Sequence, residues 1–208
     1  MTPVVRALII ANVIGYGLQY LLGNFAMAQF ALWPIGSFLD PDTGAMVGFK
    51  PWQLITSAFL HDPDNLLHLL LNMFALYMFG RDVEARLGAS KFTTLYFASV
   101  LAGSLAQLFM VSMAVEEGVA ATVGASGGVF GVLLAFAVLF PKRKLIVIPI
   151  PIPMPAWFLV TAYAVIELTM GVFGTQQGVA HFAHLGGMVG AAIVLFAGRR
   201  PDPPRFPA

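Results

Sequence analysis

Residues 124–144 read GASGGVFGVLLAFAVLFPKRK, and this stretch decides the fold. Between Gly124 and Phe140 no side chain is charged, and Ser126 alone carries a polar group. Pro141 then disfavours continuation of a helix, and three basic residues follow it. An apolar helix that ends in basic residues is typical of a membrane span whose end faces the cytoplasm. The stretch therefore predicts a transmembrane helix with a serine in its first turn.

The composition extends this interpretation to the whole chain. Of 208 residues, 59% are hydrophobic and only 10% are charged, whereas a soluble domain is usually about 25% charged. The absence of cysteine excludes a disulfide scaffold, a thiolate metal site and a cysteine nucleophile. A net charge of +1 argues against a nucleic-acid partner. The sequence thus predicts a polytopic membrane protein.

Six apolar stretches are candidates for membrane spans, each bounded by charges, proline or glycine. They cover residues 4–22, 65–80, 92–114, 126–140, 156–174 and 181–198. The second, fourth and sixth look short for a span of roughly 20 residues or contain polar residues in their outer halves. We expect an all-α, six-transmembrane-helix bundle forming one domain over residues 1–198, followed by a short cytoplasmic tail over 199–208. The proline-rich run 148–155 is expected to be a stiff, extended connector before the fifth span.

The basic residues predict the orientation of these spans. Ten of the eleven lie on one side of the predicted bundle, with Lys50 alone on the other. The positive-inside rule then places both termini in the cytoplasm and the loop 23–64 outside, together with loops around Glu116 and Gln176. A cleaved signal peptide ending at the Ala-Met-Ala of residues 26–28 is an alternative with the same orientation. The basic residues on the cytoplasmic side suggest that this membrane is a bacterial inner membrane.

Four polar side chains share one depth in the predicted bundle. At about 1.5 Å per residue, Ser126, His184 and His68 each lie roughly 20–22 Å from the cytoplasmic end of their span. Asn72 follows His68 by four residues, so the two lie on one helical face. Polar groups at membrane depth are costly and need a reason. We therefore expect these four to form a site open to the outer aqueous side.

These residue types in this arrangement point to nucleophilic catalysis. A serine hydroxyl needs a neighbouring imidazole to take its proton, and His184 is preferred to His181 for this role. The backbone N–H groups of the first turn at Ser126 are candidate donors to an oxyanion. His181 is expected to line a water-filled cavity. Glu167 is the one acidic residue in the six stretches, and it remains a candidate third member, although a Ser–His dyad is the expected arrangement.

Small residues on the fourth and sixth spans supply a way to bring the serine and the histidine together. Small-xxx-small faces let helix backbones approach closely. These residues are Gly127, Gly128, Gly131, Gly186, Gly187, Gly190 and Ala191.

The chain resembles the rhomboid family of intramembrane serine proteases. The resemblance rests on Gly124-Ala125-Ser126-Gly127, His184-x-x-Gly187, His68-x-x-x-Asn72 and Glu84-x-Arg86, in this order. It implies that Ser126 is the nucleophile, that His184 is the base, and that His68, Asn72 and the Ser126 N–H form an oxyanion hole. It also implies cleavage of single-span membrane protein substrates within the lipid bilayer, with no metal or cofactor.

Two departures from the family pattern and two other functional classes accompany this resemblance. The Trp-Arg pair of many members reads Trp52-Gln53, which questions the anchoring of the first loop, and Ala191 replaces a glycine.

A catalytically inactive rhomboid-like protein that binds membrane clients is the main alternative function; a channel or transporter is the other. Glu84 and Arg86 are expected to be structural, joining a loop to a helix end, and His61 is expected to be a loop residue.

Overall fold

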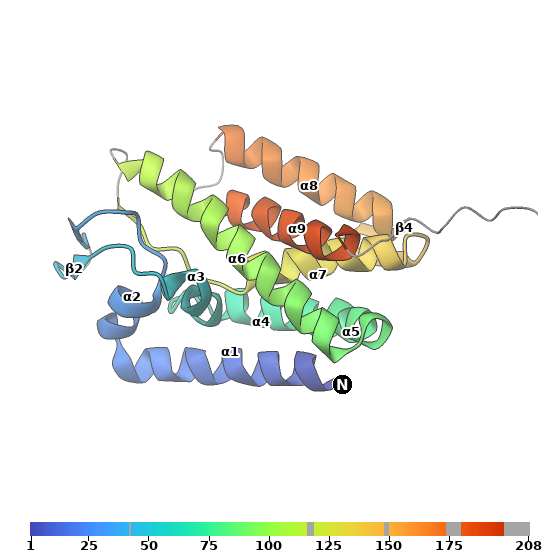
Figure 1. Ribbon diagram of the computed structural model, residues 1–208, viewed down its shortest axis with the longest axis horizontal. Helices are drawn as coiled ribbons and strands as arrows, with labels where there is room; N and C mark the ends of the chain where they lie inside the picture. Colours follow the sequence, from blue (N-terminus) through green and yellow to red (C-terminus); the bar gives the residue numbers. More distant parts are fainter. Residues whose placement is uncertain (42, 116–118, 148–149, 174–179, 198–208) are drawn as a thin grey trace, which may run out of the picture.

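The computed structural model describes residues 1–41, 43–115, 119–147, 150–173 and 180–197, and most of these lie in helices (Figure 1). The long helices are α1 (Pro3–Leu22), α6 (Ala89–Met113), α7 (Ser126–Leu139), α8 (Ala156–Phe173) and α9 (His181–Phe196). One more long helix is continuous and consists of α4 (Leu66–Ala75), the π-helical turn η2 (Leu76–Gly80) and α5 (Arg81–Leu87). The short elements are α2 (Asn24–Phe30), β1 (Phe38–Leu39), β2 (Met46–Val47), α3 (Gln53–Thr56), η1 (Ser57–Phe59), β3 (Lys144–Val147) and β4 (Ile150–Pro155).

Four of the described helices are long and apolar enough to cross a membrane. They are α1, the continuous α4–η2–α5 helix, α6 and α8. Helices α7 and α9 are apolar but have only 14 and 16 residues. At about 1.5 Å per residue they reach about 21 and 24 Å, less than a hydrocarbon core of about 30 Å. The fourth and sixth apolar stretches are therefore short, as predicted. The second carries the polar residues His68 and Asn72 in its first half, as predicted, and its helix continues through η2 to Leu87.

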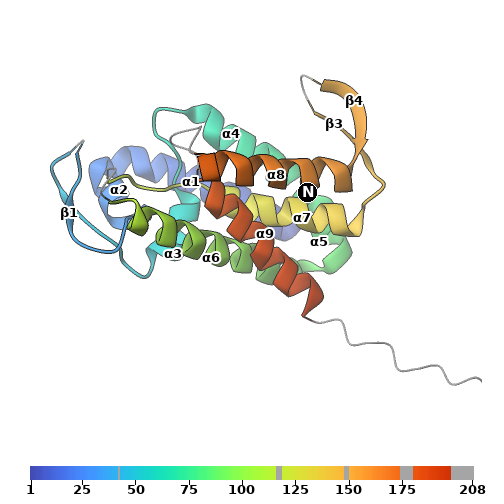
Figure 2. The same cartoon turned by 90° about the horizontal axis from the view of Figure 1, so that it is seen from above.

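The three helices α6, α7 and α9 form the centre of the bundle. In Figures 1 and 2, α1 and α8 lie on opposite sides of this group, and α4 runs beside α7. The start of α1, helix α5 and the β3–β4 hairpin all lie at one end of the bundle, while α2 and the β1–β2 hairpin lie at the other. The basic residues in the described part of the chain divide in the same way, because all but Lys50 belong to the first of these ends.

The close approach of the central helices depends on glycine. A Cβ atom on Gly187 of α9 would lie 2.0 Å from the carbonyl oxygen of Gly127 on α7. A Cβ on Gly103 of α6 would likewise lie 2.6 Å from the carbonyl oxygen of Ala183 on α9. These Cβ atoms would clash, so the backbones of the central helices can pack this closely only because glycine has no side chain. The glycine faces predicted from the sequence are therefore the surfaces on which α7 and α9 meet.

The first loop is folded around the buried side chain of Gln53. Its Oε1 accepts hydrogen bonds from the backbone N–H groups of Trp33 and Lys50, at 3.3 and 3.1 Å. Its Nε2 donates to the carbonyl oxygens of Gln29 and Gly48, at 3.3 and 3.4 Å. Buried amide groups with several partners hold a loop firmly. The replacement of an expected arginine by Gln53 therefore does not leave this loop without an anchor.

Glu84 joins the second long helix to the first. Its buried carboxylate accepts hydrogen bonds from the backbone N–H groups of Val4 and Val5, at 3.0 and 2.8 Å. These donors belong to the first turn of α1, where N–H groups lack partners within the helix and negative charge is favoured. The structural role expected of Glu84 at a helix end is thus observed, whereas Arg86 is exposed on α5.

The described part of the proline-rich run, β4, is extended and leads directly into α8, as expected for a connector. Strands β3 and β4 pair antiparallel, with Leu145 opposite Met154, immediately before α8 begins. The pairing of this extended segment with β3 was not foreseen, and proline permits it because β4 lies at the edge of a two-stranded sheet. The tail 199–208 and the loops around Glu116 and Gln176 lie outside the described residues.

Candidate active site

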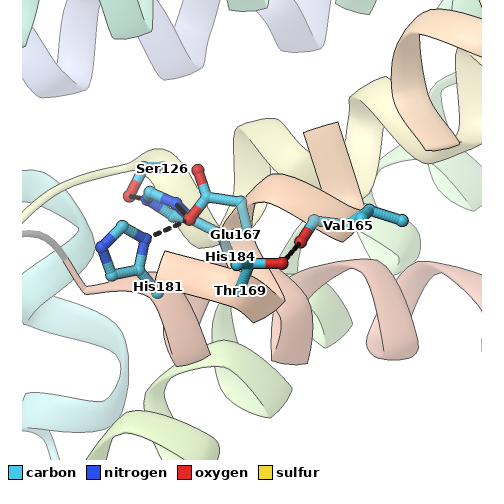
Figure 3. Close-up of polar contacts among 6 residues, drawn as sticks. All are labelled: Ser126, Val165, Glu167, Thr169, His181 and His184. Atoms are coloured by element: carbon cyan, nitrogen blue, oxygen red, sulfur yellow. Dashed lines mark hydrogen bonds and ion pairs between the residues drawn. The ribbon is translucent and has the colours of Figure 1, made fainter. Parts of the chain in front are cut away.

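Ser126 and His184 meet at the start of two helices. Ser126 is the first residue of α7, and His184 lies in the first turn of α9. Ser126 Oγ and His184 Nε2 are 2.8 Å apart, within hydrogen-bonding distance (Figure 3). A serine at this distance can pass its proton to a neutral imidazole as it attacks a carbonyl carbon. The pair expected from the sequence is therefore in reactive proximity.

The imidazole of His184 is held flat against an aromatic ring. The rings of His184 and Phe130 are stacked with centroids 4.1 Å apart and planes 5° apart. Because Phe130 follows Ser126 by one turn, helix α7 positions both the hydroxyl and one face of the ring that bonds it. Sequence reasoning missed Phe130, since one phenylalanine in an apolar span carries no sign of what it contacts.

Glu167 and His181 complete a polar cluster around His184. Glu167 Oε2 lies 2.6 Å from His181 Nδ1 and 2.9 Å from His184 Nδ1 (Figure 3). The first contact has hydrogen-bond geometry; in the second the carboxylate oxygen lies off the direction of the N–H bond, although the distance suits one. His181 is buried and bonds Glu167 through Nδ1, a contact that was not foreseen, and its expected place in the wall of a water-filled cavity stays a prediction.

The same three side chains are a possible set of metal ligands within the described part of the chain. One ligand atom from each of Glu167, His181 and His184 lies within 4.8 Å of the other two. Ligands at about 2.0–2.2 Å from a tetrahedral metal lie about 3.3 Å apart. The distances of 2.6 and 2.9 Å from Glu167 Oε2 to the two imidazole nitrogens are shorter, and they suit hydrogen bonds better than metal ligation. The donor set therefore fits a hydrogen-bonded cluster rather than a metal centre.

His68 faces the backbone that leads into the serine. Gly124 has φ +128°, and a Cβ there would lie 2.9 Å from both Cε1 and Nε2 of the His68 ring. This position requires glycine for its backbone conformation and for the imidazole beside it. Asn72 behaves differently, because its Nδ2 donates 2.9 Å to the carbonyl oxygen of His68 in its own helix. The structure thus brings His68 to the serine loop and leaves Asn72 one turn away.

A small cavity of about 20 Å³ opens beside the serine. Its wall includes Ser126 and four other residues with polar side chains: Ser57, Ser104, Gln107 and Thr122. A cavity of this size and polarity has room for one water molecule.

Comparison with known proteins identifies the family of this chain. The family model of the rhomboid domain matches residues 48–201, which include every residue of the cluster. The chain belongs to the rhomboid family. Like other rhomboids, it is an integral membrane protein with membrane-spanning helices.

Several curated rhomboid relatives match most of the chain. Rhomboid protein 1, mitochondrial, from Saccharomyces cerevisiae is 40% identical over 145 residues, which cover 67% of this chain and 41% of that protein. RHOMBOID-like protein 7 from Arabidopsis thaliana is 28% identical over 185 residues, 84% of this chain and 54% of that protein. Rhomboid protease AarA from Providencia stuartii is 28% identical over 161 residues, 70% of this chain and 55% of that protein. The chain spans about half the length of these relatives.

The relatives bear on the expected compartment of this rhomboid. They include mitochondrial proteins of yeast and Arabidopsis, so they give no support to the expectation of a bacterial inner membrane. What the family establishes is residence in a membrane.

His61 forms a second, unforeseen part of this rhomboid's site. It precedes α4 and is fully buried, with its ring 5.1 Å from that of His68. Neither of its ring nitrogens has a hydrogen-bond partner among the described residues. Burial, with a smaller contribution from the neighbouring His68, lowers the pKa of His61 to about 4. His61 therefore lies in a loop, as expected, and its buried neutral ring packs against His68.

Proposed function

We propose that this rhomboid is an intramembrane serine endopeptidase that uses Ser126 as nucleophile and His184 as base. The observation that carries the proposal is the 2.8 Å contact between Ser126 Oγ and His184 Nε2 at the first turns of two apolar helices. A structural serine in a helix contact needs no imidazole on its hydroxyl, and a buried imidazole beside it is costly unless it is used. An inactive client-binding protein would have no need of either group in this arrangement.

The proposed reaction follows from the positions of these atoms. Ser126 Oγ attacks the carbonyl carbon of the substrate peptide bond while its proton moves to His184 Nε2. The tetrahedral intermediate collapses, and the same proton passes to the leaving amine. Water then attacks the acyl group on Ser126, with His184 again acting as base, and the serine is regenerated. The N–H groups of the first turn of α7 and the His68 side chain are the donors to the oxyanion.

The proposed setting is a bundle of six spans with both termini in the cytoplasm. The collection of basic residues at the end that holds the start of α1, α5 and the β3–β4 hairpin supports this orientation (Figure 1). Ser126 then lies nearer the outer surface. Its depth suits substrates that are single transmembrane segments and reach the serine laterally. Such a segment must unwind before its carbonyl can reach Ser126, so glycine or proline near the cut favours cleavage.

A serine-directed fluorophosphonate tests this function directly. Purified wild-type protein is expected to be labelled and to cleave a model single-span substrate, because the probe reacts only with a serine activated by a base. The Ser126→Ala variant is expected to take no label, whereas the variant Ser90→Ala, at an exposed position at the start of α6, is labelled like wild type. Labelling that persists in Ser126→Ala, or wild-type protein that is neither labelled nor active, would contradict the proposal.

The oxyanion role of His68 predicts a loss of rate. We expect His68→Ala to reduce turnover about 10²–10³-fold, the usual cost of one oxyanion donor, while Ser126 still takes the label more slowly. Asn72→Ala is also expected to reduce turnover, but less than His68→Ala, because the Asn72 amide already bonds the carbonyl oxygen of His68. Turnover in detergent and in liposomes gives both values. Unchanged rates in both variants would assign these side chains to helix packing alone.

A further inference from the structure

Glu167 is a buried acidic residue within a membrane-spanning helix. It lies within α8, where every other side chain is uncharged and most are apolar, and it is only 9% exposed. An acidic side chain within a membrane span is costly unless it is paired, so such residues mark functional positions. The Ser–His mechanism proposed above does not use it.

The partners of Glu167 are two imidazoles from α9 that meet on one oxygen. Oε2 lies 2.6 Å from His181 Nδ1 and 2.9 Å from His184 Nδ1 (Figure 3). The opposite nitrogen of His184, Nε2, is the atom that contacts Ser126 Oγ at 2.8 Å. The four side chains therefore form one connected series, from His181 through Glu167 and His184 to Ser126.

The position of this carboxylate influences which nitrogen of His184 carries the proton. A carboxylate only accepts hydrogen bonds, so it favours the tautomer with hydrogen on Nδ1. Nε2 then presents a lone pair to the serine hydroxyl, as a general base must. After proton transfer the imidazolium faces a negative charge. In the opposite tautomer, Nε2 would carry a hydrogen and be unable to accept the serine proton.

We propose that Glu167 is the positioning residue of a Ser126–His184–Glu167 triad, with His181 holding its carboxylate in place. The inference rests on the proposed function, and it replaces the dyad expected from the sequence. His181 provides the aligned hydrogen bond to Oε2, so it fixes the carboxylate against α9 while His184 moves slightly during the reaction. The imperfect alignment of the His184 contact agrees with this role, since catalytic hydrogen bonds often tighten only when substrate is bound.

The test compares two replacements of Glu167 in the full-length protein. Glu167→Leu removes both charge and acceptor and is expected to lower kcat about 10³–10⁴-fold with KM changed little, as when a triad base loses its correct tautomer. Glu167→Gln keeps an acceptor oxygen without the charge and is expected to fall between Glu167→Leu and wild type. The rate of fluorophosphonate labelling should fall in the same order, whereas the final amount of label should equal that of wild type.

Thr169→Val is the matched control on the same helix. Thr169 lies two residues after Glu167, is exposed, and donates its hydroxyl hydrogen to the Val165 carbonyl oxygen at 2.8 Å within α8 (Figure 3). This variant is expected to keep the kcat and labelling rate of wild type. A loss in Thr169→Val equal to that in Glu167→Leu would show that α8 tolerates no change, and would overturn the specific role of Glu167.

His181 gives a second, independent measurement. His181→Phe is expected to lower kcat about tenfold, and the double variant with Glu167→Leu should be no slower than Glu167→Leu alone, because coupled residues are not additive. Wild-type kcat in Glu167→Leu, with wild-type protein active and labelled, would refute the triad while leaving the Ser–His mechanism intact. Activity that is lost to a chelator and restored by Zn²⁺ would instead make the three residues metal ligands and overturn the proposal.

Discussion

Replacing Ser126 with alanine is expected to lower the turnover of a model transmembrane substrate by a factor on the order of 10⁴ or more. His184→Ala should lose about as much, because the serine hydroxyl is a weak nucleophile without a base at 2.8 Å from its oxygen. The double variant should be no slower than either single variant, since residues that act as one unit give non-additive losses. The measurement is single-turnover cleavage by purified protein in liposomes.

These variants also separate catalysis from folding. Neither side chain fills a large part of the core, so thermal unfolding in detergent should stay close to that of wild type. Losses that multiply in the double variant would mean that the two residues act in separate steps. Substantial cleavage by Ser126→Ala would remove the serine from the mechanism altogether.

Replacing Gly187 with alanine is expected to impair both stability and catalysis. The added Cβ would lie 2.0 Å from the Gly127 carbonyl oxygen and 3.0 Å from the Gly127 Cα, so α7 and α9 must separate. Overpacking of this kind typically costs about 1–3 kcal/mol of the free energy of unfolding. The catalytic effect should be larger than this suggests, because Ser126 adjoins Gly127 and His184 lies one turn before Gly187. A shift of about 1 Å between reacting groups can cost about 10²-fold in rate.

Gly17→Ala is the control for this prediction. Gly17 lies inside α1, and a Cβ there would have nothing within 4 Å. Alanine also has the higher helix propensity, so this variant should be as stable and as active as wild type. Thermal unfolding and turnover of the two variants, measured side by side, check the prediction. A Gly187→Ala protein that matches wild type in both would show that the α7–α9 contact is not what fixes the active site.

The sequence by itself determined the membrane character of the chain, the approximate bounds of its long helices and the candidates for its reactive residues. These properties are local. A run of apolar residues decides where a helix can be buried in lipid, and a serine or histidine within such a run stands out because polar groups are costly there. The glycine faces near Ser126 and His184 were also visible, because small residues at regular spacing have a direct physical meaning.

Only the tertiary structure decided which polar groups meet. Glu167 was recognisable as the acid within the apolar stretches, yet its contact with His184 depends on how α8 and α9 are rotated against one another, which no spacing within either helix specifies. The contacts of Gln53, His61 and Asn72 could not be predicted from the sequence either. Gln53 and His61 contact residues of other segments, and the Asn72 amide bonds a backbone carbonyl in its own helix. Helices are formed by neighbouring residues, but a catalytic cluster is formed by the packing of helices that are distant in the chain.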